Sequence, residues 1–166
     1  MEKQLHWVNE AFSRQVVIMD GDRVVGAMHR DLLVRDVDAY LNDVHIFFDV
    51  TGFLAHSVNI HDKNAGDKII GRIDFGVFNG ASVHLETGEK YVWQRENFMM
   101  HEWSLVTDDP DTHSGQEIVH YDRTRKFLAD EGTIELVTEL PNAEMLILTG
   151  LFVRNYFLRK RKIATT

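Results

Sequence analysis

The sequence predicts a mainly β protein in which about a dozen short antiparallel strands, arranged as a barrel or a sandwich, precede one buried C-terminal helix. Between residues 3 and 140, apolar and polar residues alternate with a period of two in short segments, which are separated by glycine, asparagine and aspartate. After Pro141 the chain changes to a long apolar stretch. With 166 residues, 44% of them hydrophobic, and only two prolines, the chain suits a single domain, 1–166, with a substantial core.

The expected strands follow one another with turn residues between them. The clearest hairpin signal is Gly21-Asp22, which separates the apolar segments 16–20 and 24–28. Further strands are expected at 32–37, 40–50 with a turn at 41–43, from 53 to 61, 69–75, 81–86, 91–93, 98–107, 118–121, 125–128 and 133–140. Strands of this number and spacing are typical of an all-β barrel or sandwich.

A weak internal repeat indicates that the strands form similar hairpins. Residues of matching classes recur 45 positions apart: Phe48, Phe53, His56, Val58 and Ile60 correspond to Trp93, Phe98, His101, Trp103 and Leu105. Each unit has an apolar face that it cannot bury alone, so we expect the units to share one core.

The last part of the chain, from Pro141 to Lys162, is expected to form an enclosed helix at about 142–160. Its apolar residues surround the helix instead of forming a stripe along one side, and such a helix must be buried. Asn142 can cap the start of the helix. The apolar run ends at Arg154, well short of the roughly 20 residues that a bilayer requires, so no transmembrane span is expected.

Charge and residue usage exclude several classes of function. The net charge of -8 argues against broad nucleic-acid binding, which needs a surplus of lysine and arginine. Because the chain has no cysteine, disulfides, thiolate metal sites and cysteine nucleophiles are excluded. The segment from Met1 to Val8 does not have the pattern of a secretory signal, so a cytoplasmic location is expected.

Nine histidines raise the question of a metal site. The candidates in or near the repeated segments are His56, His61, His101, His113 and His120, with Asp62 or Glu102 as a carboxylate ligand. Nothing in their spacing requires them to converge, so neither a metal nor a cofactor is expected. The acidic loop 108–111 lacks the ordered ligands of an EF-hand and is interpreted as a solvated hairpin loop.

No pattern in the sequence identifies a catalytic residue. Ser57 or Ser104 could serve as a nucleophile only beside a histidine base, and no Gly-x-Ser-x-Gly turn presents either hydroxyl. A phosphate-binding glycine loop is also absent from the sequence, and the carboxylates show no pairing that would single out an acid and a base. The tryptophans Trp7, Trp93 and Trp103 lie at alternating strand positions, which favours the core over a stacking site for a ligand.

The order of elements resembles the tubby C-terminal-like superfamily, which includes tubby domains, phospholipid scramblases, the plant LURP-one-related group and small bacterial proteins. The resemblance is carried by the segment 57–62 with the strand 69–73 after it, by the segment 88–93, and by the terminal apolar helix. It implies a barrel of roughly twelve strands around a central helix. Tubby domains bind phosphoinositides through basic residues on the barrel wall, and the sequence shows no matching group of lysines or arginines.

Two functions follow as hypotheses. The first is a non-enzymatic binding or scaffold module of the tubby-like type that meets membrane lipid or a protein partner. The alternative is a small-molecule-binding or hydrolytic barrel with a histidine and carboxylate site in its mouth. A helix that fills the barrel favours the first. The candidate lipid-binding residues are Arg159, Lys160, Arg161 and Lys162, which would give peripheral attachment to an anionic membrane; their other role is to complement the helix dipole.

Overall fold

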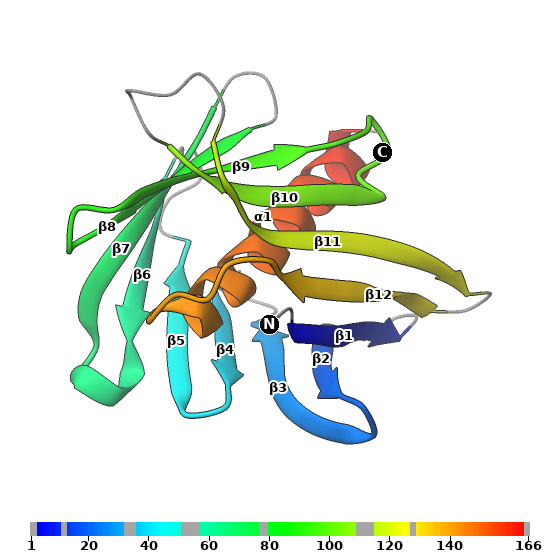
Figure 1. The fold of residues 1–166 in the computed structure, drawn as a ribbon, viewed down its shortest axis with the longest axis horizontal. Coiled ribbons are helices and arrows are strands. Elements are labelled where there is room, and N and C mark those ends of the chain that lie inside the picture. Colours follow the sequence, from blue (N-terminus) through cyan, green and yellow to red (C-terminus); the bar gives the residue numbers. More distant parts are fainter. Residues whose placement is uncertain are drawn as a thin grey trace.

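The computed structural model describes residues 3–10, 13–31, 36–50, 57–76, 80–108, 115–126 and 129–164. Within these ranges, twelve antiparallel strands form a closed barrel around one helix, which confirms the predicted class of fold (Figure 1). The strands are β1 (Lys3–Glu10), β2 (Gln15–Asp20), β3 (Arg23–Arg30), β4 (Val37–Leu41), β5 (Val44–Asp49), β6 (Ser57–Asp62), β7 (Lys68–Phe75), β8 (Ala81–Leu85), β9 (Lys90–Arg95), β10 (Glu102–Thr107), β11 (Glu117–Lys126) and β12 (Ala129–Leu136). A short 3₁₀ helix, η1 (Lys63–Ala65), precedes β7, and the helix is α1 (Ala143–Ala164).

Each strand pairs with the strand that follows it in the sequence, and β1 pairs with β12 to close the barrel. In this last pair Lys3 lies opposite Leu136 and Glu10 lies opposite Ala129. Each of the twelve described strands therefore has a partner on both sides, so none of them offers an edge on which another chain could add a strand.

The core lies between the inner wall of the barrel and α1. Alternate strand residues point inward, and the three tryptophans Trp7, Trp93 and Trp103 are all buried, as the alternation predicted. Phe48 of β5 stacks on Phe152 of α1 with ring centroids 4.2 Å apart.

The helix is enclosed, as its all-round hydrophobicity predicted. Leu146, Leu148, Leu151 and Val153 are buried together inside the barrel. α1 continues to Ala164, four residues beyond the expected end at 160, because the basic residues at this end form helix well and complement the negative end of the helix dipole.

Two aromatic side chains of the wall bond to backbone carbonyls of α1. Trp93 Nε1 donates to the carbonyl of Gly150 at 3.1 Å, and the Tyr121 hydroxyl donates to the carbonyl of Ile147 at 2.9 Å. A Cβ atom at position 150 would lie 2.0 Å from the Tyr121 hydroxyl oxygen. The glycine that interrupts the apolar run is therefore the residue that lets β11 approach the helix.

Arg154, the charged residue in the apolar run, lies inside the barrel with only 2% of its side chain exposed. Its guanidinium pairs with both carboxylate oxygens of Asp130, at 2.7 and 3.2 Å. It also lies 4.8 and 4.6 Å from the ring centroids of Trp7 and Trp103, respectively. The buried charge is thus neutralised by a carboxylate and held between two aromatic rings.

The predicted bounds of three strands were wrong. The strand expected at 98–107 begins only at Glu102, because a turn precedes it in which Met100 has a φ of 55° and the Asn97 side chain accepts from the backbone N–H of His101. The break expected after 121 does not exist, because β11 continues to Lys126 along β12 despite its polar residues. The strand expected at 133–140 begins at Ala129 and ends at Leu136.

The repeat matches two hairpins of the barrel, β5–β6 and β9–β10. Phe48 and Trp93 are buried on the first strand of each hairpin, and Val58 and Trp103 are buried on the second. Phe53, His56 and most of the strand expected at 32–37 lie outside the described residues.

Candidate functional site

The two ends of the barrel differ in composition. One end of the barrel, where α1 begins, carries the connections β2–β3, β4–β5, β6–β7 and β8–β9. These connections are rich in charged residues, asparagine and glycine, so we call this the polar end. The residues concerned are Gly21-Asp22, Asn42-Asp43, Lys63 to Asp67 and Glu86 to Glu89. The connections β1–β2, β3–β4, β5–β6, β7–β8, β9–β10 and β11–β12 lie at the opposite end, which we call the apolar end.

Large apolar residues characterise every connection at the apolar end. Five of these connections contain segments outside the described residues, and in sequence those segments hold Phe12, Leu32, Phe53, Phe78 and Phe127. The sixth, between β9 and β10, is described throughout, and it presents Phe98 and Met99 to solvent with 72% and 59% of each residue exposed. Two large apolar side chains exposed side by side, Phe98 and Met99, make this connection a candidate interaction surface.

The β9–β10 turn is anchored on its inner side, and this holds Phe98 and Met99 outward. Met100 is fully buried, and its carbonyl accepts from Nε of Arg154 at 3.3 Å. The guanidinium of Arg95 lies 5.3 Å from the centroid of the Phe98 ring and adds a positive charge beside the exposed pair.

The candidate lipid-binding residues lie at the same end. Phe75, the last residue of β7, stacks on Tyr156 of α1 with centroids 4.2 Å apart, so the C-terminal half of α1 emerges at the apolar end. Figure 1 shows the C-terminus of α1 beside the β9–β10 connection. Arg159 is half-buried, with Nε 3.4 Å from the carbonyl of Asn155, and Lys160 is exposed, with Nζ 5.9 Å from the centroid of the Tyr156 ring.

Arg161 and Lys162 belong to the same last turns of α1, and their side chains lie outside the described ones. All four basic residues are therefore part of the last turns of α1, at the negative end of the helix dipole. The apolar end thus combines an exposed apolar pair with a basic helix terminus.

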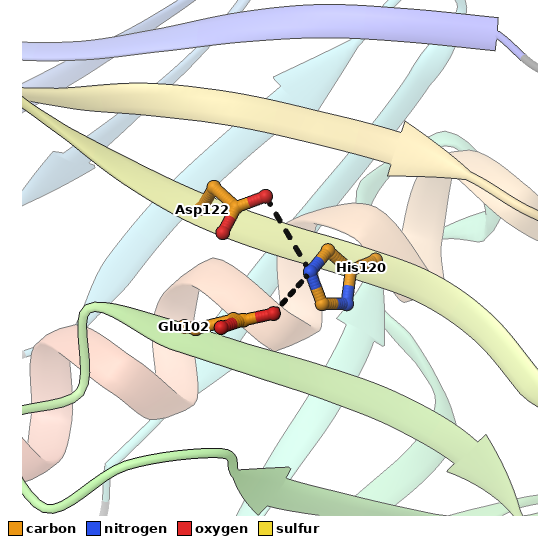
Figure 2. A group of neighbouring side chains, drawn as sticks. All are labelled: Glu102, His120 and Asp122. Atoms are coloured by element: carbon orange, nitrogen blue, oxygen red, sulfur yellow. Dashed lines mark ion pairs between the residues drawn. The ribbon is translucent and has the colours of Figure 1, made fainter.

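A second group of side chains lies on the outer wall of the barrel: Glu102, His120 and Asp122, which we call the outer-wall cluster (Figure 2). Glu102 of β10 lies opposite Asp122 of β11 in the strand register, and His120 lies two residues before Asp122 on the same face. Nε2 of His120 is 3.0 Å from an oxygen of Glu102 and 3.4 Å from an oxygen of Asp122. The His120 side chain is 17% exposed.

A third carboxylate holds the other side of the His120 ring. Oε2 of Glu117, three residues earlier on β11 and across the irregularity in the β10–β11 register, lies 3.2 Å from Nδ1. Desolvation is the largest single influence on the pKa of His120 and lowers it, but Glu117, Asp122 and Glu102 together outweigh desolvation and raise the pKa above its ordinary value.

The other candidate histidines do not join this cluster. Nε2 of His61 lies 3.3 Å from a carboxylate oxygen of Asp49, and the ring of His101 lies 3.1 Å from the guanidinium of Arg123. Asp62 accepts a hydrogen bond from the backbone of Asn64 at the start of η1. His56 and His113 lie outside the described residues.

Sequence reasoning named His120 and Glu102 but missed Asp122 and Glu117. The period of two along β11 could have placed His120 and Asp122 on one face. The proximity of Glu102 could not be predicted, because it depends on the register between β10 and β11. Of the serines considered as nucleophiles, Ser104 is buried, and its hydroxyl donates to Glu96 at 2.9 Å.

Comparisons with known proteins leave the family open. No family model, curated protein or solved structure matches the chain. Among the described residues, the structure contains no helix with the length and hydrophobicity needed to cross a bilayer. The likeness to the tubby C-terminal-like superfamily therefore stays a prediction, and the site must be interpreted from its own geometry.

Proposed function

We propose that this chain is a non-enzymatic binding module that attaches peripherally to an anionic membrane surface through its apolar end. The observation that carries the proposal is that the β9–β10 connection, which exposes Phe98 and Met99, lies at the same end of the barrel as the basic C-terminus of α1 (Figure 1). Apolar side chains that enter the boundary between headgroups and acyl chains, together with nearby cations, are the usual combination in peripheral attachment.

The filled interior supports binding at the surface over binding inside the barrel. Phe152 stacks on Phe48, Trp93 donates to the helix backbone, and Leu146 and Leu148 are completely buried. A ligand in the mouth of an open barrel would need the space that these side chains occupy. This packing favours the surface module over the alternative of a small-molecule-binding or hydrolytic barrel.

The expected energies indicate reversible attachment. Complete burial of one large apolar side chain contributes about 1.5–3 kcal/mol, and Phe98 and Met99 could each contribute part of that. A lysine or arginine near an anionic bilayer contributes on the order of 1 kcal/mol. The net charge of -8 opposes these terms, because the acidic body of the chain is repelled by the same surface. Attachment should therefore need both the apolar pair and the basic residues.

Sedimentation with vesicles tests the proposal. Vesicles of phosphatidylcholine alone are compared with vesicles that also contain phosphatidylserine, at low and at moderate salt. The wild-type chain should sediment with the anionic vesicles, more strongly at low salt, because charge attraction extends over roughly 30 Å at 0.01 M ionic strength but only roughly 8 Å at 0.15 M. The double variant Phe98→Ser/Met99→Ser and the variant with residues 159–162 all changed to Gln should each lose most of the binding.

The matched control is Val24→Gln. Val24 lies at the polar end with 54% of its surface exposed, so its replacement removes a comparable apolar side chain without touching the apolar end. This variant should bind as the wild type does. No binding by the wild type would refute membrane attachment, and equal binding by all variants would refute attachment through the apolar end. In either case the exposed pair Phe98 and Met99 would be assigned to a protein partner.

A further inference from the structure

We propose that the outer-wall cluster is a site for one divalent transition-metal ion of the Zn²⁺ class, bound by Glu102, His120 and Asp122. This inference is independent of membrane attachment, because it concerns the wall of the barrel and uses neither Phe98 nor the end of α1. The sequence predicted no metal because its histidines need not converge. The structure instead brings carboxylates from two strands to a single histidine.

The spacing of the three ligand atoms suits a small tetrahedral ion. Ligands about 2.0–2.1 Å from zinc at a tetrahedral angle lie roughly 3.3–3.4 Å from one another. Nε2 of His120 is 3.0 Å from Oε1 of Glu102 and 3.4 Å from Oδ2 of Asp122, and all three ligand atoms lie within 4.8 Å of one another. Small side-chain adjustments would therefore complete three corners of a tetrahedron. The fourth corner would be open to water, since both carboxylates are nearly half exposed.

The hydrogen bond to Glu117 is the second reason for the proposal. Because an ionised carboxylate can only accept, its contact with Nδ1 selects the ring form that carries its proton on that nitrogen. In the neutral ring the lone pair of Nε2 then faces two carboxylate oxygens, which is an arrangement of three acceptors with no donor. Only a cation at this point, either a proton or a metal ion, makes the arrangement favourable.

The same hydrogen bond has the form of an outer-shell contact in a metal site. A histidine that binds a metal commonly donates its other ring N–H to a carboxylate, and this contact orients the ring and makes it a stronger ligand. In this site the Glu117 carboxylate would accept from Nδ1 of His120, and Nε2 of the same ring would bind the metal. The three carboxylates also carry more negative charge than one protonated imidazole can neutralise, whereas a divalent ion would balance two of them.

The ligand set selects the class of metal. An imidazole nitrogen favours zinc and its neighbours among the transition metals, while Mg²⁺ and Ca²⁺ prefer a shell made entirely of oxygen atoms. We therefore expect Zn²⁺ to bind far more tightly than Mg²⁺ or Ca²⁺. Binding should weaken below neutral pH, because a proton and the metal compete for the same Nε2.

Titration calorimetry on the full chain, first dialysed against a chelator, tests the site. Zn²⁺ should bind with a stoichiometry of one and should raise the temperature of thermal unfolding. His120→Gln and Asp122→Asn should each abolish this binding. Glu117→Gln keeps all three ligands and should weaken binding by about 10- to 100-fold, as the loss of an outer-shell contact does elsewhere.

The control is His84→Gln. His84 also lies on the outer wall near a carboxylate, with 3.3 Å between its Nε2 and Asp74, but Arg72 already pairs with that carboxylate at 2.9 Å. This variant should bind Zn²⁺ as the wild type does. Circular dichroism would establish that each variant is folded. If His120→Gln does not fold, Asp122→Asn still tests the site, because it removes a ligand and keeps the imidazole. Failure of the wild type to bind Zn²⁺, or unchanged affinity in folded His120→Gln and Asp122→Asn, would overturn the proposal.

Discussion

The two faces of β10 and β11 perform different tasks with the same backbone. On the inner face, Trp103 and Tyr121 stack with centroids 5.1 Å apart, and Tyr121 bonds to the helix. On the outer face, one residue away along each strand, Glu102 and Asp122 are nearly half exposed around His120. Changes on the inner face should alter stability most, because its side chains are buried away from water in the folded chain. The outer face can carry binding chemistry, because partly exposed ion pairs contribute little to stability.

The largest expected effect tests the inner face. Leu148→Asp places a charge at a completely buried position on α1 with no partner, so unfolding in urea should show a loss of about 4 kcal/mol or more in the free energy of unfolding. Val24→Asp, at an exposed strand position, should cost about 1 kcal/mol or less. Similar losses for the two variants would contradict a core built around α1.

A smaller effect is expected where the inner face contains a charge. Arg154→Met leaves Asp130 without its buried partner and should cost about 3 kcal/mol, at the low end for a broken buried pair, because Arg123 stays 2.7 Å from the same carboxylate. The measurement is a double-mutant cycle with Asp130→Asn, followed by urea unfolding. If the loss of free energy of unfolding in the double variant equals the sum of the two single losses, the ion pair does not couple β12 to α1.

The smallest effect belongs to the outer face and depends on pH. The pKa of His120 is raised in the folded chain, so its protonation stabilises the fold fully below the unfolded pKa of about 6.5, and this contribution is lost as the pH rises through the folded value. With metal removed by chelator, His120→Gln should cost on the order of 1 kcal/mol or less at pH 5.5 and still less at pH 8.5. A cost that grows toward alkaline pH would contradict the assigned direction.

The strand pattern and the helix could be predicted because both depend on local sequence. Alternation with a period of two placed Trp93 and Trp103 inside, and hydrophobicity on all sides of α1 required that the helix be enclosed. Strand ends were less predictable. The turn before Glu102 depends on a positive φ at Met100. Methionine does not favour a positive φ, so the sequence gives no turn signal at this position.

The sequence by itself determined that a wall of strands must cover an apolar helix, since neither can bury its apolar surface alone. It also placed four basic residues at the end of that helix. Only the tertiary structure decided which residues from other parts of the chain lie near the strands and the basic end of the helix. The path of α1 through the barrel brings its basic terminus to the end that carries Phe98 and Met99, and the register of β10 on β11 brings Glu102 to His120. Contacts of this kind join residues far apart in the chain, and their geometry is set by the packing of the whole barrel, which no local pattern encodes.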